Sequence, residues 1–367
     1  MLNGQLRYKN CMFELHYNLY ICGTSSLALM IPEKNVSLKT YNTFGIDVNA
    51  ALFLEVHSIN DFRECLSNSI FKELPWMVIG GGSNILLTRD FEGLVLKNSI
   101  KGIEKVSENA EHVYVKAGAG EVWHQFVLYC ISNNYGGAEN LSLIPGSVGA
   151  GPMQNIGAYG AELKDIFFEL EALDLATGAV HTFNNADCKF GYRNSIFKNS
   201  HKNQYIILSV TFELRKQPVF NVRYGAIETE LKAMGVQELS LKAISDAVCN
   251  IRKSKLPDPA LLGNAGSFFK NPEVSNQKYA DLKENYPDLV AYPTSAETMK
   301  LAAGWMIEKC GWKGRQFDNY GVHKNQALVL VNYGGASGKS IFELSTEIVD
   351  SVRKTFGVDL EIEVNVV

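Results

Sequence analysis

Glycine placement is the feature that most restricts how this chain of 367 residues can fold. The run IPGSVGAGPMQNIGAYG, from Ile144 to Gly160, has glycine at 146, 149, 151, 157 and 160 together with Gln154 and Asn155. Glycine weakens regular structure, so it is concentrated where the backbone turns tightly or approaches something closely. The run therefore predicts backbone wrapped around a ligand and not a plain connection.

A second glycine segment, GGGSN from Gly80 to Asn84, directly follows an apolar strand expected at residues 76–79. Upstream, an expected strand at 52–56 and a helix beginning at Ser58 or Asn60 complete an α/β unit. Ligands favour the carboxyl ends of strands in such sheets, and backbone amides there can approach a diphosphate. This segment alone can also be an ordinary tight turn, and it is not the GxGxxG of a dinucleotide fold. Two such segments suit a long cofactor that contacts different parts of the chain.

Hydrophobic periodicity predicts the remaining elements. Strands are expected from Val113, over 169–175 and 205–214, and over 327–331; a helix with buried Trp123 and Phe126 is expected before Gly136. A capping box of Thr294 with Glu297 predicts a helix that buries Met299 to Cys310 and stops at Gly311, and another helix follows Gly338. Residues 360–366 alternate strictly, which predicts a strand with Glu361, Glu363 and Asn365 on its polar face.

Bulk composition excludes several classes of protein. The formal net charge of −4 and the absence of a basic run argue against nucleic-acid binding. Seven scattered cysteines, without metal-ligand spacing to a histidine, fit a reducing compartment and predict no metal site. No apolar run reaches the roughly 18 to 20 residues that span a bilayer. We expect a soluble, cytoplasmic, monomeric protein, with residues 1–35 a disordered extension or a misassigned start upstream of Met30.

Three further motifs carry polar groups among small and aromatic residues. FGYRNSIFK, residues 190–198, contains Tyr192 and Arg193, whose guanidinium can pair with a carboxylate or remain an ordinary surface charge. RYG places Tyr224 in a polar loop. KLPDPALLGNAGSFFKNP, residues 255–272, reads as a rigid loop that aims Ser267 inward; without a histidine and aspartate frame, a proton-donor role is favoured over a hydrolase triad.

Taken together these motifs resemble the UDP-N-acetylenolpyruvoylglucosamine reductase family over about residues 36–367. The resemblance rests on NTFGI (residues 42–46), GGGSN, the 144–160 run, FGYRNSIFK, KLPDP with GNAGSFFKNP, and the closing LEIEV. The glycine loops are also similar to those of FAD domains of the vanillyl-alcohol-oxidase type.

The resemblance implies an architecture of mixed α/β and α+β class. A vanillyl-alcohol-oxidase-type FAD-binding fold of two subdomains, residues 36–102 and 103–251, would precede a carboxyl-terminal α+β substrate-binding domain, residues 252–367. A tyrosine loop near residues 219–240 would close over the substrate. The last strand would return to the active site.

It also implies a reaction: NADPH reduces non-covalent FAD, which then reduces UDP-N-acetylglucosamine enolpyruvate to UDP-N-acetylmuramate for peptidoglycan synthesis. Ser267 matches the family's general acid, and Arg193 and Glu363 match the groups at the substrate carboxylate, where Glu363 needs a raised pKa. The FAD contacts implied are Gly80, Gly81, Gly82, Ser83, Asn84, Gly146, Ser147, Gly149, Gln154, Asn155, Gly157 and Arg252. The substrate contacts implied are Tyr192, Tyr224, Lys255, Asn271 and Lys313.

Two alternative functions remain open from the sequence. An oxidase on the same FAD scaffold often links its flavin through histidine, and neither glycine loop contains one. A nucleotide-binding regulator without catalysis would have no reason to keep Ser267, Arg193 and Glu363 together.

Overall fold

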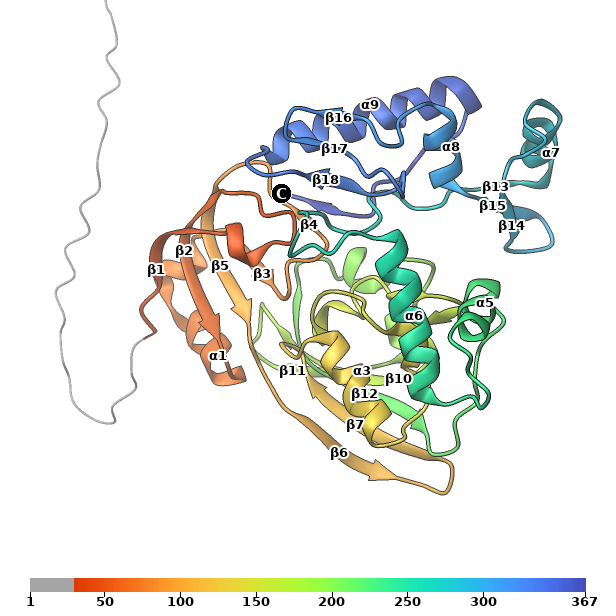
Figure 1. Ribbon diagram of the computed structural model, residues 1–367. Coiled ribbons are helices and arrows are strands. Elements are labelled where there is room, and N and C mark those ends of the chain that lie inside the picture. Colours follow the sequence, from red (N-terminus) through yellow and green to blue (C-terminus); the bar gives the residue numbers. More distant parts are fainter. Residues whose placement is uncertain (1–29) are drawn as a thin grey trace, which may run out of the picture.

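The computed structural model describes residues 30–367, so residues 1–29 of the expected extension lie outside the described part. The first strand, β1 (Glu33–Ser37), begins slightly before the expected start of family-like sequence. Figure 1 shows three regions: a sheet that contains β1, a larger sheet around β12, and a group of carboxyl-terminal helices and small sheets.

The first sheet has the strand order β1-β2-β5-β3, with β2 (Asn49–Val56) and β3 (Trp76–Ile79) both parallel to β5 (Phe91–Asn98). Helix α1 (Ile59–Ser67) begins as expected after Ser58, because Ser58 and Asp61 form a reciprocal capping box. The short helix α2 (Ser69–Lys72) follows. Since β3 is parallel to its neighbour, the glycine turn that follows it lies at the carboxyl edge of the sheet.

The second sheet has the order β11-β10-β12-β7-β6 and is antiparallel throughout. Helix α3 (Trp123–Ser132) covers it through a cluster that includes Trp123, Phe126 and Phe212, all fully buried. The strands are β6 (Ile103–Glu108), β7 (His112–Gly118), β10 (Phe167–Asp174), β11 (Val180–Asn184) and β12 (Tyr205–Arg215). The expected strands from Val113, at 169–175 and at 205–214 are therefore confirmed.

Several short elements lie in the connections between the strands of these two sheets. They are β4 (Ile85–Leu86), β8 (Gly157–Ala158), β9 (Ala161–Glu162), α4 (Asn185–Cys188) and the 3-10 turns η1 (Lys39–Tyr41), η2 (Glu139–Leu141), η3 (Val148–Ala150), η4 (Leu163–Asp165) and η5 (Ile196–Lys198). Helices α5 (Gly225–Ala233) and α6 (Leu241–Lys255) pack on each other through Ile227, Leu231, Ile244 and Val248. Helix α6 runs through residue 252, where a domain boundary was expected, and points its last turn toward the glycine run.

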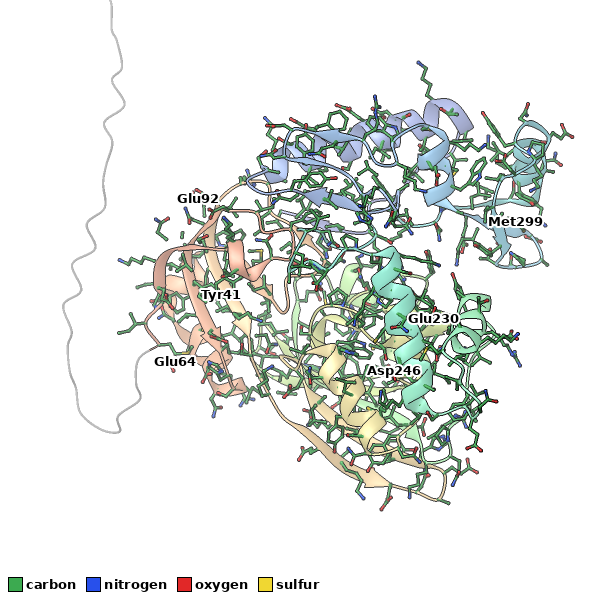
Figure 2. The ribbon with its side chains drawn as sticks, viewed as in Figure 1. Tyr41, Glu64, Glu92, Glu230, Asp246 and Met299 are labelled. Atoms are coloured by element: carbon green, nitrogen blue, oxygen red, sulfur yellow. The ribbon has the colours of Figure 1, made fainter. Side chains whose placement is uncertain are left out.

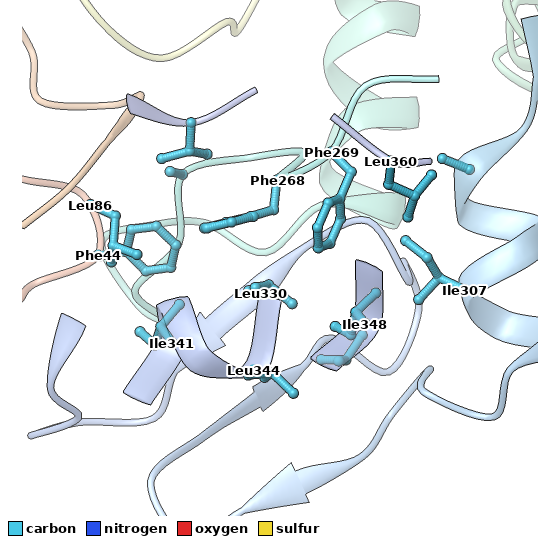
Figure 3. Close-up of a cluster of buried hydrophobic side chains, with 14 of the residues drawn as sticks. Phe44, Leu86, Phe268, Phe269, Ile307, Leu330, Ile341, Leu344, Ile348 and Leu360 are labelled. Carbon is cyan, nitrogen blue, oxygen red and sulfur yellow. The ribbon is translucent and has the colours of Figure 1, made fainter. Parts of the chain in front are cut away.

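The carboxyl-terminal region contains two three-stranded sheets, ordered β13-β15-β14 and β16-β17-β18. Its elements are β13 (Glu273–Ser275), α7 (Asn276–Asn285), β14 (Ala291–Pro293), β15 (Thr298–Leu301), α8 (Ala303–Lys309), β16 (Gln316–Phe317), β17 (Tyr320–Val322), β18 (Leu330–Asn332), α9 (Gly338–Phe356) and β19 (Asn365–Val366). Figure 3 shows Phe268 and Phe269 inserted among Leu330, Ile348 and Leu360. These two aromatic side chains fix the segment that carries Ser267.

The helix expected from Thr294 to Cys310 is wrong over its first half. Thr294 Oγ1 contacts Thr298 Oγ1 at 2.9 Å and the Thr298 carbonyl at 3.1 Å, so the hydroxyl closes a hairpin between β14 and β15 and caps no helix. Met299 lies in β15 (Figure 2). The helix begins only at Ala303, and it ends before Gly311, which adopts a positive φ of 78° as expected of a helix stop.

Two other expected strands are shorter or shifted. Strand β18 starts at Leu330, three residues later than expected, and only Asn365–Val366 of the terminal run pairs as a strand, parallel to β4. Residues 360–364 lie along the Ser267 segment, with Glu363 N donating to the Phe268 carbonyl at 2.8 Å. Leu360 and Val364 are buried as expected, but Val366 is 38% exposed. The terminal run nevertheless returns to the glycine turn, beside the end marked C in Figure 1.

Candidate active site

A cavity of about 950 Å³ lies where the three regions meet. This is at the upper end of the roughly 300 to 1,000 Å³ typical of sites for small molecules. Its walls come from the GGGSN turn, the glycine-rich run, the FGYRNSIFK segment, the end of α6, the Ser267 segment and the terminal run. Residues more than 270 positions apart in the chain therefore face one space.

The two glycine segments contact each other across one side of this cavity. A Cβ added to Gly81 would lie 2.7 Å from the Cα of Gly146, and one added to Gly80 would lie 2.0 Å from Ser147 Oγ. Ser83 Oγ also donates to the Pro145 carbonyl at 3.1 Å. A side chain at 81 would force the two backbones apart, which is the physical reason for glycine there, and one at 80 would displace the Ser147 hydroxyl.

Most of the expected FAD contacts line the cavity, and three do not. Those that line it are Gly80, Gly81, Gly82, Ser83, Asn84, Ser147, Gln154, Gly157 and Arg252. Gly146 instead packs on Gly81, and a Cβ on Gly149 would lie 2.5 Å from that of Ala119. Asn155 is fully buried and bonds to the Gly191 carbonyl and the Lys164 amide, each at 3.0 Å. These three residues therefore support the glycine-rich run on its side away from the cavity.

Arg193 and Glu363 form an ion pair at the cavity wall, with Arg193 Nε 3.0 Å from Glu363 Oε1. Arg193 adopts a positive φ of 51° in a tight turn bracketed by Gly191 and Asn194, whose backbones hydrogen-bond to each other. A second guanidinium N–H donates to the Gly157 carbonyl at 2.7 Å. Burial raises the pKa of Glu363 against the opposing effect of Arg193, in the direction expected for a carboxyl that must be protonated.

Lys198 is a cavity residue that the sequence analysis missed. Its ammonium donates to Gln154 Oε1 at 3.2 Å and lies 3.5 Å from the Glu363 carbonyl oxygen. Gln154 Oε1 also accepts from Asn84 at 2.7 Å, so one amide oxygen joins both glycine segments to this lysine. Burial lowers the pKa of Lys198, with the nearby Lys270 acting in the same direction. Its place in FGYRNSIFK, one turn after Arg193, was the available signal.

Ser267 lines the same cavity from a segment held on both sides. Its backbone bridges to Val329, and Phe268 N donates to the Leu328 carbonyl at 2.7 Å. The next two side chains, Phe268 and Phe269, are at most 1% exposed. These contacts fix the backbone of Ser267 at the cavity wall.

The expected substrate contacts divide into two groups. Tyr192 and Asn271 line the cavity, and Lys300, which was not expected, places its ammonium 3.8 Å from the centre of the Tyr192 ring. Tyr224, Lys255 and Lys313 do not line it. Tyr224 is 45% exposed and meets Tyr159 edge to face at 5.4 Å, and Lys313 pairs with Glu308 at 3.0 Å.

Arg252 approaches the cavity from the last turn of α6, and burial lowers its pKa. Its Nε donates to the Leu143 carbonyl at 3.2 Å. Within residues 30–367 no carboxylate pairs with this guanidinium, so it can serve an electron-rich group in the cavity.

Other site types find no support in the described residues. From Met30 onward, no set of three His, Cys, Asp or Glu side chains is arranged to hold a metal ion. Over the same stretch, no helix is both long and apolar enough to cross a membrane.

Comparisons with known proteins agree on one family. Residues 258–367 match the model of the UDP-N-acetylenolpyruvoylglucosamine reductase carboxyl-terminal domain, and residues 50–184 match an FAD binding domain. The chain is 50% identical over 335 residues to a UDP-N-acetylenolpyruvoylglucosamine reductase of Amoebophilus asiaticus, covering 91% of this chain and 99% of that one. For the reductases of Flavobacterium johnsoniae and Pseudomonas putida the identities are 48% and 50%, with 91% of this chain covered in both cases and 99% and 98% of theirs.

A solved structure agrees with the fold. The crystal structure of the reductase from Thermus caldophilus superposes with a TM-score of 0.62 at 24% identity, covering 92% of this chain and 99% of that one. Because relatives of 50% identity align with 91% of this chain and with nearly their whole length, this chain belongs to the UDP-N-acetylenolpyruvoylglucosamine reductase family.

Proposed function

We propose that this protein reduces UDP-N-acetylglucosamine enolpyruvate to UDP-N-acetylmuramate with electrons from NADPH, and that Ser267, Arg193 and Glu363 carry the chemistry. Family membership makes the chain a flavin-dependent oxidoreductase of peptidoglycan precursor synthesis. The observation that supports the residue assignment is their arrangement: a hydroxyl, a guanidinium and a carboxyl from three distant segments line one cavity with both glycine segments.

The cavity wall fits FAD. Gly80 to Ser83 and Ser147 line the cavity with backbone and small side chains, and Arg252 offers a cation without a carboxylate partner among the described residues. We propose that these residues, with Asn84, Gln154 and Gly157, hold the cofactor without a covalent bond. When bound, FAD supplies the hydride, which it receives from NADPH.

Arg193 and Glu363 would bind the substrate carboxylate. Hydride addition to the terminal vinyl carbon moves negative charge through the double bond onto that carboxylate. Arg193 can stabilise this charge by a charge-assisted hydrogen bond, and its turn geometry aims the guanidinium before the substrate arrives. Burial raises the pKa of Glu363, which favours the protonated form that can donate to the same group instead of repelling it.

Ser267 would complete the reaction by giving its proton to the other vinyl carbon. Serine is a weak acid in water, so the alkoxide it leaves must be stabilised by its surroundings. Arg193 and Lys198 are the cations that line the cavity nearest to Glu363, and they make the site electropositive. The bridge to Val329 fixes the backbone that carries the hydroxyl.

We propose that Tyr192 and Asn271 bind the substrate inside the cavity, and that Tyr224, Lys255 and Lys313 join it from outside when the segment near residues 219–240 closes. The side chain of Tyr224 is half-exposed and meets Tyr159 edge to face, which supports a role in a loop that closes over the substrate. Domain boundaries near residues 102 and 252, a cytoplasmic location, a monomeric state and a role in cell shape and division complete the proposal.

The assignment is tested by following the two half-reactions separately. Under nitrogen, NADPH should bleach the yellow protein, and the enolpyruvyl substrate should restore the colour where oxygen-free buffer does not. Ser267→Ala should leave bleaching near the wild-type rate and slow recolouring by roughly 10²- to 10⁴-fold, the usual contribution of a positioned acid. Ser67→Ala, at an exposed serine in α1, is the matched control.

Three results would contradict the proposal in different ways. Equal loss in both half-reactions of Ser267→Ala would remove the serine from the acid role. Recolouring by oxygen alone, at the rate seen with substrate, would favour an oxidase. A protein that binds the UDP-sugar but is never bleached would favour a regulator.

A further inference from the structure

Leu143 connects two functional segments through an unusual backbone conformation. Its φ is +57°, a region that side chains of this size rarely adopt and that surrounding contacts must sustain. It directly precedes Ile144 and Pro145, which line the cavity. The conformation of this one residue therefore sets how the glycine-rich run enters the site.

Two hydrogen bonds hold the backbone of Leu143, one at its N–H and one at its carbonyl. Its N–H donates to Nδ1 of His124 at 3.0 Å, and its carbonyl accepts from Arg252 Nε at 3.2 Å. His124 lies in the first turn of α3, and Arg252 lies in the last turn of α6. We infer that His124 is a positioning residue: by holding Leu143, it fixes the carbonyl that aims the Arg252 guanidinium into the cavity.

The surroundings of His124 favour the state that this role needs. To accept from Leu143, Nδ1 must carry no proton. Burial lowers the pKa of His124, and the neighbouring Arg252 and Lys253 act in the same direction. Its position at the amino-terminal end of α3 further disfavours a positive charge. Asp246 of α6 is the acidic group that shares with His124 an outer groove of about 470 Å³.

The other contacts near Leu143 do not replace its hydrogen bond with His124. Ser142 is tied to α6 by the contact of its hydroxyl with that of Ser245 at 2.7 Å, and Trp123 N donates to the Gly146 carbonyl at 3.0 Å. These contacts fix the residues on either side, but neither engages the peptide groups of Leu143. Without His124, the Leu143 N–H is left without its acceptor and the carbonyl orientation is free to change.

The test compares two substitutions in the full chain. Asparagine has an oxygen at the same position along the side chain as Nδ1, so His124→Asn keeps an acceptor, whereas His124→Phe removes it. We expect His124→Phe to weaken FAD binding by the apoprotein by roughly 2- to 12-fold, the worth of one ordinary hydrogen bond. We also expect a more negative flavin midpoint potential, because the cation of Arg252 is less well aimed. His124→Asn should restore both values.

A double-mutant cycle separates positioning from general packing. If His124 acts through Arg252, the effect of His124→Phe on FAD affinity and potential should be largely absent in an Arg252→Lys background, in which the donor to Leu143 is changed. If His124→Phe does not fold, His124→Ala takes its place in the cycle.

The inference rests on the proposed contact between Arg252 and FAD. The outcomes distinguish a failure of the His124 role from a failure of that contact. It is overturned if His124→Phe lowers the melting temperature of the apoprotein while FAD affinity and potential stay at wild-type values. It is also overturned if both losses are equally large with arginine or lysine at 252. If Arg252→Lys alone changes neither affinity nor potential, the proposed Arg252 contact itself is wrong.

Discussion

Replacing Gly81 by alanine tests the contact between the two glycine segments. The added Cβ would lie 2.7 Å from Gly146 Cα, whereas carbon atoms in contact ordinarily lie about 3.5 to 4.0 Å apart. The segments would have to separate by about 0.8 Å or more at this point. Neither partner is a flexible side chain, so the backbone must move.

The size of the effect follows from the cost of overpacking. Such insertions into a closely packed region usually cost about 1 to 3 kcal/mol. Strain that remains in the apoprotein lowers its free energy of unfolding; strain relieved by opening the segments appears instead as weaker FAD binding, by up to roughly 160-fold. The two losses together should amount to about 1 to 3 kcal/mol.

The assay is urea unfolding of the apoprotein combined with titration of FAD by flavin fluorescence. Gly225→Ala is the matched control, because a Cβ there meets nothing within 4 Å and the residue is the first of α5. Alanine in a helix is up to about 1 kcal/mol more favourable than glycine, so this control should be neutral or stabilising. If Gly81→Ala also leaves both stability and FAD affinity unchanged, the two segments are not packed as described and the argument for glycine at this position fails.

Three further outcomes follow from the site. Glu363→Gln should remove a pH dependence of the free energy of unfolding. Burial raises the pKa of Glu363, so its contribution to wild-type stability is fully present below about pH 4 and is lost as pH rises through the raised pKa. Urea unfolding of the wild type relative to the variant should show that slope. A difference between the two curves that does not vary with pH would contradict it. Lys198→Met should raise KM for the UDP-sugar by roughly 10- to 160-fold, the range for hydrogen bonds to charged groups. The apoprotein melting temperature should stay unchanged or rise, because burial disfavours the ammonium. A lower melting temperature with normal KM would refute this. Asn271 Oδ1 accepts from the first N–H of α8 at 3.0 Å, so Asn271→Ala should lower the free energy of unfolding by about 0.5 to 2 kcal/mol, and Asn271→Asp, which keeps the acceptor, should not.

Local chemistry made part of the fold predictable. The capping box of Ser58 and Asp61 marks the start of α1 within the local sequence. The three glycines after Trp76–Ile79 mark the end of that strand in the same way. The helix expected from Thr294 failed because a hydroxyl followed by a glutamate is equally suited to a turn, and pairing with β13 and β14 decided the outcome. The pairing with β13 joins residues distant in sequence, such as Glu273 and Lys300, which periodicity does not detect.

The site shows the same division. The resemblance to the reductase family, which rests on six motifs in order, brought Ser267, Arg193 and Glu363 into one set, whereas Arg193 taken alone could equally be a surface charge. Glycine, however, indicates a close approach without indicating what approaches: Gly81 lines the cavity, but Gly146 packs against Ser83 and Gly149 against Ala119. Lys198 and Lys300 escaped notice because a lysine gains its meaning from neighbours that only folding supplies.

Backbone strain accompanies the site at several residues. Among residues 30–367, the residues with positive φ that are not glycine, asparagine or aspartate are Leu143, Tyr159, Lys189 and Arg193, and all but Lys189 belong to the segments around the cavity. Each conformation is unfavourable by itself, so it persists only where surrounding hydrogen bonds over-determine it. For Arg193 those bonds are the paired backbones of Gly191 and Asn194 and the carbonyl of Gly157. A relaxed turn would be more stable locally, but it would not direct the guanidinium toward Glu363, and this is a physical reason why a fold would retain the strain at this position.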